Sequence, residues 1–163
     1  MFRLNFFHRK RILVVNDEED VLTIVTARLR QNGYQVLVAS DGLEGLRTAQ
    51  KESPDLIFVD VTIPRINGFQ MVQLLRHDKL LKEIPTLVVT ASHHKDEVAW
   101  WAQLGIHHLL VKPFETKVLL EKIQELLQNP SLQKSGRGSL WQILNKRILI
   151  VDRIFHSRTD SNT

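Results

Sequence analysis

The chain has 163 residues, of which 43% are hydrophobic, and a formal net charge of +4. This length is enough for one well-buried domain and a short remainder. The absence of cysteine excludes disulfides, thiolate catalysis and cysteine-bound zinc. No apolar stretch approaches the roughly 20 residues of a membrane span, and the first ten residues lack the apolar core of a signal peptide. We therefore expect a cytoplasmic protein with no membrane partner.

Five short apolar runs alternate with five helical patterns. The strands are expected near residues 11–16, 34–39, 56–60, 86–90 and 107–112, and the helices near residues 19–31, 42–52, 67–78, 95–104 and 114–128. Short unbroken apolar runs bounded by turn signals are typical of strands that are buried on both faces. Their alternation with helices predicts right-handed crossovers and a doubly wound parallel α/β sheet.

Polar residues stand where these apolar runs end. The first run leads into Asn16-Asp17, the third ends in Asp60, the fourth in Thr90 and the fifth in Lys112. Parallel strands present their carboxyl ends at one edge of the sheet, where ligands bind. Two carboxylates, a hydroxyl and an ammonium at one edge predict a Mg²⁺-dependent phosphoryl site.

The sequence changes character after residue 128. Residues 129–139 have linker composition, rich in Ser, Gly and Pro, and residues 146–152 repeat residues 10–16 with five identities in seven positions. Residues 10–128 hold 14 Lys/Arg and 16 Asp/Glu, whereas residues 129–163 hold six and two. We divide the chain into an N-terminal extension (1–9), a domain (10–128), and a linker with a basic tail (129–163). The tail contains an orphan strand similar to the first strand of the domain. A basic tail can bind nucleic acid, but without a DNA-binding motif we expect a solvated tail and no nucleic-acid partner.

Residues 10–128 resemble a receiver domain of the two-component response regulators, and residues 146–152 resemble the start of a truncated second one. The resemblance is carried by a set of short motifs in the family's order and spacing: Ile12 to Glu18, Asp60 followed by Pro64 and Gly68, Thr90-Ala91, and Lys112-Pro113-Phe114. It implies a flavodoxin-like sheet of five parallel strands in the order 2-1-3-4-5, with helices on both faces.

The resemblance also implies a role for each matched residue. Asp60 matches the phosphoacceptor, which attacks a phosphohistidine on a partner. Asp17 matches a direct Mg²⁺ ligand, Asp60 and the backbone carbonyl of Thr62 complete the protein ligands, and Asn16 occupies a position that touches the metal through water.

Three more matches concern Thr90, Lys112 and the peptide bond that follows Lys112. Thr90 matches the hydroxyl that receives a phosphoryl oxygen. Lys112 matches the cation that pairs with the acceptor carboxylate and then with the phosphoryl group. The bond between Lys112 and Pro113 resembles the family's cis peptide.

Two positions depart from the family pattern. Asn16 replaces the first of two acidic residues, which indicates either a working site with weaker Mg²⁺ affinity or a pocket that never turns over. Leu109 replaces a Tyr or Phe whose ring moves inward when the Thr hydroxyl moves, so we expect the switch to use another movement.

The expected function is that of a receiver in a phosphorelay, not an enzyme. Its partners would be a histidine kinase or a histidine phosphotransfer protein, and a downstream protein at the face formed by the fourth helix, fifth strand and fifth helix. A homodimer is left open, and the residues after 128 are too few for a winged-helix effector. The alternative is a pseudo-receiver that binds a partner without phosphorylation. A haloacid dehalogenase type phosphatase is disfavoured because Thr62 stands where such enzymes carry a second Asp.

Two further pairs have plainer interpretations. His93-His94 and His107-His108 fall at opposite ends of the predicted sheet, so solvated or locally bonded histidines are favoured over a metal site. Trp100 and Trp101 are adjacent on the fourth helix, where neighbours point about 100° apart. One ring is expected to pack inward, and the other is a candidate partner contact.

Overall fold

The computed structural model describes residues 8–92 and 94–129. Five strands and five helices alternate in this part of the chain: β1 (Arg11–Val15), α1 (Glu19–Gln31), β2 (Gln35–Ala39), α2 (Gly42–Glu52), β3 (Leu56–Asp60), α3 (Gly68–His77), β4 (Thr86–Thr90), α4 (Lys95–Gln103), β5 (Leu109–Val111) and α5 (Thr116–Gln128). The expected linker from residue 130 on, the orphan strand and most of the N-terminal extension lie outside the described residues. None of the described helices combines the length and apolar character that a membrane span needs.

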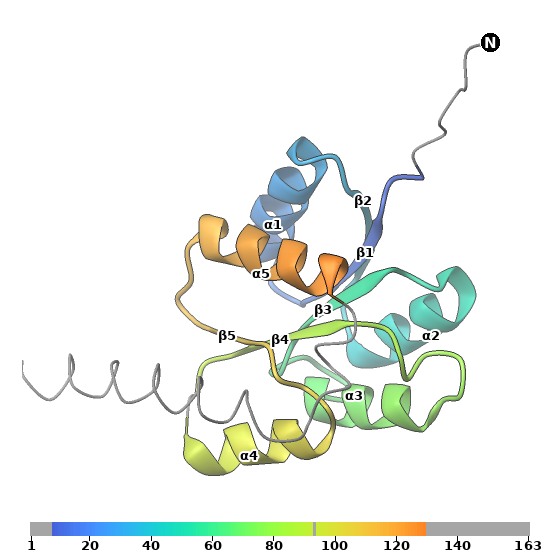
Figure 1. Ribbon diagram of the computed structural model, residues 1–163, viewed down its shortest axis with the longest axis vertical. Helices are drawn as coiled ribbons and strands as arrows, with labels where there is room; N and C mark the ends of the chain where they lie inside the picture. Colours follow the sequence, from blue (N-terminus) through green and yellow to red (C-terminus); the bar gives the residue numbers. More distant parts are fainter. Residues whose placement is uncertain (1–7, 93, 130–163) are drawn as a thin grey trace, which may run out of the picture. The chain divides into compact units, whose positions relative to one another are not determined.

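The strands form one parallel sheet in the order β2-β1-β3-β4-β5. Helices α1 and α5 lie on one face, and α2, α3 and α4 lie on the other (Figure 1). The prediction of a doubly wound, flavodoxin-like sheet is therefore confirmed.

Each face of the sheet has its own hydrophobic core, and alternate residues of a strand pack into one core or the other. Leu13, Ile57 and Val88 pack toward α2, α3 and α4, whereas Val14 and Phe58 pack toward α1 and α5. All are fully buried. This explains why the strands read as continuous apolar runs, because both faces of a parallel sheet are covered.

The last elements begin later than the sequence indicated. The fifth strand starts at Leu109 instead of residue 107, and α5 starts at Thr116 instead of residue 114. Phe114 packs edge to face on Phe58, with ring centroids 6.4 Å apart. It packs into the α1–α5 core, two residues ahead of the first turn of α5.

Two contacts hold the loop from β3 to α3. The N–H of Gly68 donates to the carbonyl of Val61 at 3.0 Å, and Arg65 pairs with Asp41 at 3.3 Å. Gly68 is required here because a Cβ at this position would fall against the carbonyl oxygen of Asp60. The entry of α3 thus packs directly on the backbone of the strand end that carries the site.

Gly68→Ala should lower the free energy of unfolding by about 1–3 kcal/mol, because the added methyl group overpacks against backbone that cannot rotate away. Urea unfolding measures the loss. Gln73→Ala, at an exposed position of the same helix, should change stability by less than about 0.5 kcal/mol. Equal small effects for both variants would show that the contact is not tight.

Candidate functional site at the carboxyl edge of the sheet

The ends of β1, β3, β4 and β5 meet at one edge of the sheet. Asp60 closes β3 and pairs in register with Val89, one residue before the end of β4. Thr90 closes β4 and pairs with Val111, one residue before Lys112. The backbone N–H of Lys112 donates to the carbonyl of Thr90 at 2.8 Å. The residues predicted from separate strand ends are therefore neighbours.

Asp60 is a buried carboxylate, only 2% exposed, with donors on both oxygens. Its Oδ1 accepts the backbone N–H of Thr62 at 2.8 Å. Its Oδ2 accepts the side-chain amide of Asn16 at 3.0 Å and is paired with the ammonium of Lys112. A buried charge is tolerated only when it is paired and hydrogen-bonded, and Asp60 meets both conditions.

Asn16 is fully buried and has a defined amide orientation. Its Oδ1 accepts the backbone N–H of Glu18 at 2.7 Å, and its Nδ2 donates to Asp60. Since Glu18 offers a donor and Asp60 an acceptor, the opposite orientation would leave two mismatched contacts. The amide therefore presents hydrogens to Asp60, which an aspartate at this position could not do.

Lys112 bridges two carboxylates. Its Nζ pairs with Asp60 and lies 3.0 Å from Oε1 of Glu18. Burial by itself lowers the pKa of Lys112, but the hydrogen bonds and charges of Asp60 and Glu18 outweigh it and raise the pKa above the ordinary value of a lysine. The ammonium is thus charged at every physiological pH. The peptide bond from Lys112 to Pro113 is cis.

The hydroxyl of Thr90 is buried and turned toward α4. It donates to Oε1 of Glu97 at 2.8 Å and accepts the backbone N–H of Ser92 at 3.0 Å. Nothing in the sequence singles out Glu97, because an acidic residue in the first turn of a helix is ordinarily explained by the helix dipole. Glu18 was likewise missed as a partner of Lys112, although it belongs to the acidic run that follows β1.

The donor set at this edge is compatible with Mg²⁺. Asp17 follows the buried Asn16 and is exposed, and Thr62 is exposed on the loop after Asp60. Two carboxylates and a carbonyl leave several positions for water and phosphate oxygens, as Mg²⁺ prefers. The described residues contain no group of three or more His, Cys, Asp or Glu side chains suited to a metal ion. The oxygen ligands expected here, two carboxylates with a carbonyl and an amide, form a different kind of site.

Leu109 is the first residue of β5 and lies three residues before Lys112. It pairs with Val88 in the sheet and packs, partly buried, against the core beneath α2, α3 and α4. It has no polar group with which to contact Thr90. His107 and His108 precede β5, whereas His94 follows β4, so the topology keeps these histidines at opposite ends of the sheet.

Comparison with known proteins agrees with this geometry. Residues 12–124 match the response regulator receiver domain. The chain belongs to the response regulator receiver family. PilH of Pseudomonas aeruginosa is 34% identical, over 72% of this chain and 97% of PilH. The alkaline phosphatase synthesis transcriptional regulatory protein PhoP of Bacillus subtilis is 35% identical, over 76% of this chain but only 50% of PhoP.

A solved structure supports the same conclusion. The chemotaxis response regulator CheY4 of Vibrio cholerae superposes with a TM-score of 0.69 and 32% identity, over 72% of this chain and 98% of CheY4. Receiver domains are signalling modules that take part in phosphorelays, and this is the role of the matched domain. The chain spans about half of PhoP, so the rest of that regulator's activity is not carried over.

Asn16→Asp should tighten Mg²⁺ binding by about tenfold, equivalent to about 1.4 kcal/mol, because it adds a charge and removes a donor that competes for Oδ2 of Asp60. Calorimetric titration with Mg²⁺ measures the change. Without the ion, the variant should unfold at a lower temperature than wild type, since two carboxylates would then face each other. Gln124→Glu adds the same charge at an exposed position of α5 and should leave both quantities unchanged. Superimposable Mg²⁺ titrations of wild type and Asn16→Asp would refute this account of Asn16.

Lys112→Met should cost stability in a pH-dependent way. A group with a raised pKa contributes stability that is complete below its unfolded-state pKa and is lost as pH rises through its folded-state pKa. The difference in unfolding free energy between wild type and Lys112→Met should therefore be constant from neutral pH to about pH 10 and shrink above the ordinary lysine range.

Urea unfolding across this range measures the difference. Lys117→Met removes a lysine whose side chain is 82% exposed, and its effect should be near zero at every pH. A difference for Lys112→Met that grows as the pH rises would contradict the assignment.

Proposed function

We propose that this receiver is switched by phosphorylation of Asp60. The observation that carries the proposal is the state of that side chain. It is a buried carboxylate whose Oδ2 is engaged by Asn16 and Lys112, whereas Oδ1 accepts the backbone N–H of Thr62. Each carboxylate oxygen has about two acceptor positions. Oδ1 therefore keeps acceptor capacity for a new bond while the charge of the group is balanced.

The transfer step needs little chemistry from the protein. Oδ1 of Asp60 forms a bond to phosphorus as the bond between phosphorus and the donor's imidazole nitrogen breaks, and the electron pair of that bond stays on the imidazole. A carboxylate is a weak nucleophile, so the rate must come from positioning and charge neutralisation. The Thr62 N–H and the Lys112 ammonium hold the carboxylate in one orientation, and Lys112 then faces the phosphoryl oxygens.

Asp17, Asp60 and the carbonyl of Thr62 are the proposed Mg²⁺ ligands. When bound, the ion supplies positive charge against the phosphoryl oxygens. Asn16 is assigned a water-mediated contact, although its amide is already shared between Asp60 and Glu18. Because both ends of the Asn16 amide are already hydrogen-bonded, the amide is less available to the metal's water, and the proposal is a working site with weaker Mg²⁺ affinity.

The partners are proposed from the family. The phosphoryl donor is a histidine kinase or a histidine phosphotransfer protein, and the output is an altered contact at the face of α4, β5 and α5, with a homodimer as one form of that contact. Mg²⁺ and a cytoplasmic location are typical of receivers, and both belong to the proposal. The start of a second receiver-like repeat at residues 146–152 rests on the five identities with residues 10–16.

Incubation of the full chain with acetyl phosphate and Mg²⁺ tests the proposal. A shifted band on a phosphate-affinity gel is expected, and hydroxylamine should remove it because an acyl phosphate is labile to this nucleophile. Asp60→Asn should abolish the band, since an amide cannot accept the phosphoryl group.

Two further variants make the result specific. Asp17→Asn should slow phosphorylation and shift the Mg²⁺ requirement to higher concentration, whereas Asp20→Asn, at an exposed position in the first turn of α1, should behave as wild type. A band that persists in Asp60→Asn would place the acceptor elsewhere. No band at saturating Mg²⁺ would favour the pseudo-receiver, a binding module that acts without phosphorylation.

A further inference from the structure

A chain of contacts leads from the hydroxyl of Thr90 away from the site. Oε1 of Glu97 accepts the Thr90 hydroxyl at 2.8 Å and also lies 3.4 Å from the indole Nε1 of Trp101. Glu97 is half-buried, and Trp101 is 1% exposed. One carboxylate oxygen is therefore shared between a residue of the site and the largest buried side chain of α4.

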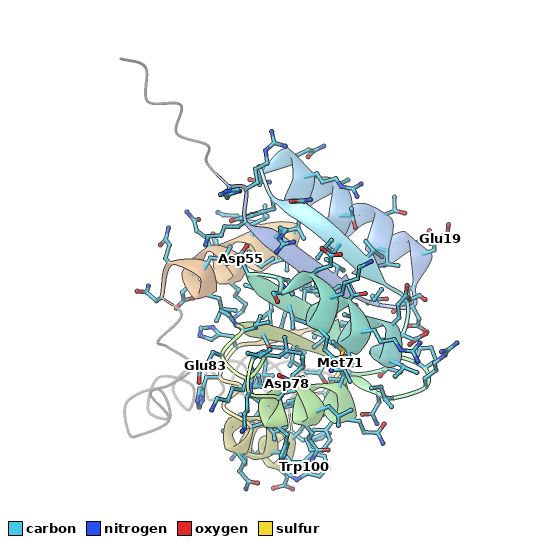
Figure 2. The ribbon with its side chains drawn as sticks, turned by 90° about the vertical axis from the view of Figure 1, so that its right-hand side faces the viewer. Glu19, Asp55, Met71, Asp78, Glu83 and Trp100 are labelled. Carbon is cyan, nitrogen blue, oxygen red and sulfur yellow. The ribbon has the colours of Figure 1, made fainter. Side chains whose placement is uncertain are left out.

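The contacts continue from Trp101 to the surface. Its ring packs edge to face on Phe69 of α3, with centroids 5.4 Å apart, and Phe69 is stacked on Trp100 at 4.2 Å and 18°. We call Phe69, Trp100 and Trp101 the aromatic cluster. Trp100 is 54% exposed, and Figure 2 shows it at the outer surface of the molecule beside α3. The cluster thus joins a buried indole to an exposed one.

We propose that Glu97 is a positioning residue that holds the Thr90 hydroxyl away from Asp60 and transmits its release to the aromatic cluster. The inference rests on the proposed phosphorylation of Asp60. A hydroxyl has one hydrogen, so Thr90 cannot donate at full strength to Glu97 and to a phosphoryl oxygen at once. Phosphorylation and the contact between Thr90 and Glu97 therefore exclude each other.

The carboxylate of Glu97 must find new partners when the hydroxyl leaves. Among the groups that contact Glu97 in the described part of the chain, the indole N–H of Trp101 is the donor that remains, and its 3.4 Å separation is long for a hydrogen bond. Shortening it turns the Trp101 ring, and that ring is fixed against Phe69, which carries Trp100. Packed aromatic contacts do not deform continuously, so a small shift at Trp101 moves the exposed ring as well.

Leu109 supports this route because it rules out a switch through an aromatic ring at position 109. It packs against the same core that contains Trp101, but its aliphatic side chain has no group to exchange hydrogen bonds with Thr90. Among the residues described around Thr90, Glu97 is the side chain that links this hydroxyl to an aromatic ring. This route would then add an exposed output centred on α3 and α4 at Trp100 to the proposed contact at the face of α4, β5 and α5.

Tryptophan fluorescence of the full chain tests the coupling. The chain has three tryptophans, so Trp100→Phe and Trp141→Phe leave Trp101 as the single reporter while Phe at position 100 keeps a ring on Phe69. Emission is followed while acetyl phosphate and Mg²⁺ are added, and the same samples are scored on the phosphate-affinity gel. Glu97→Ala, Glu97→Gln and the control Asp96→Ala, which removes an adjacent exposed charge from the same helical turn, are compared in this background.

Phosphorylation should change the Trp101 emission in the reporter protein and in Asp96→Ala. Glu97→Ala should still be phosphorylated, about threefold faster or more because the hydroxyl is no longer held by a charged acceptor, yet its emission should not respond. Glu97→Gln should restore the response, since its amide oxygen accepts from both Thr90 and Trp101. Thr90→Val, without any phosphoryl donor, should shift the emission of the reporter protein but not that of Glu97→Ala.

The phosphate-affinity gel distinguishes a failure of the proposed role of Glu97 from a failure of the proposed function. A shifted band with a silent Trp101 in the reporter protein itself, or a Glu97→Ala variant that responds as Asp96→Ala does, would overturn the role of Glu97 and leave the proposed function standing. The absence of a shifted band in the reporter protein and in wild type would overturn the proposed function and this inference with it.

Discussion

The site depends on one buried carboxylate, Asp60, and on the donors that neutralise it. A negative charge that is 2% exposed costs several kcal/mol unless partners surround it. Those partners come from three other places in the fold: Asn16 at the end of β1, the N–H of Thr62 in the following loop, and Lys112 at the end of β5. The parallel sheet brings these positions to one edge.

The groups that neutralise the charge of Asp60 also bear on its proposed reaction with a phosphoryl group. The Lys112 ammonium stabilises the resting carboxylate and, in the proposed transfer, would face the phosphoryl oxygens. The Asn16 amide adds a neutral donor to the same oxygen, so the resting state needs no metal to be satisfied. A site with an aspartate at position 16 would carry more negative charge at rest and would depend more strongly on a cation. Asn16 thus gives Asp60 a hydrogen bond from the protein where an aspartate would leave more charge for a cation to balance, and Asp60 stays in place as the proposed acceptor.

The sequence was sufficient for the parts of the structure that follow from periodicity. The runs from Ile12 to Val15 and from Leu56 to Val59 are apolar throughout because both faces of the sheet are covered, and their order with the helices predicts the topology. Asp60 and Lys112 could be placed together because parallel strands share one edge. Trp100 and Trp101 could be assigned to opposite environments from the helical repeat alone.

Other features depend on side-chain geometry that no pattern encodes. The contact of Glu97 with Thr90 joins residues seven positions apart across a strand end and a helix start, and an acidic first turn has a sufficient explanation without it. The amide orientation of Asn16 is set by the N–H of Glu18, a backbone group that the sequence does not distinguish. The start of α5 was placed too early because Phe114 fits a helical pattern but packs against Phe58 instead.

In the proposed reaction the carboxylate of Asp60, and no other, takes the phosphoryl group. Borohydride reduces an acyl phosphate to an alcohol and releases phosphate, which leaves homoserine in place of the modified aspartate. Peptide mass spectrometry after this treatment of the phosphorylated full chain locates that residue directly. We expect homoserine at position 60 and unmodified aspartate at position 17. Homoserine at another position, or at none when phosphate is bound to the protein, would show that Asp60 is not the acceptor.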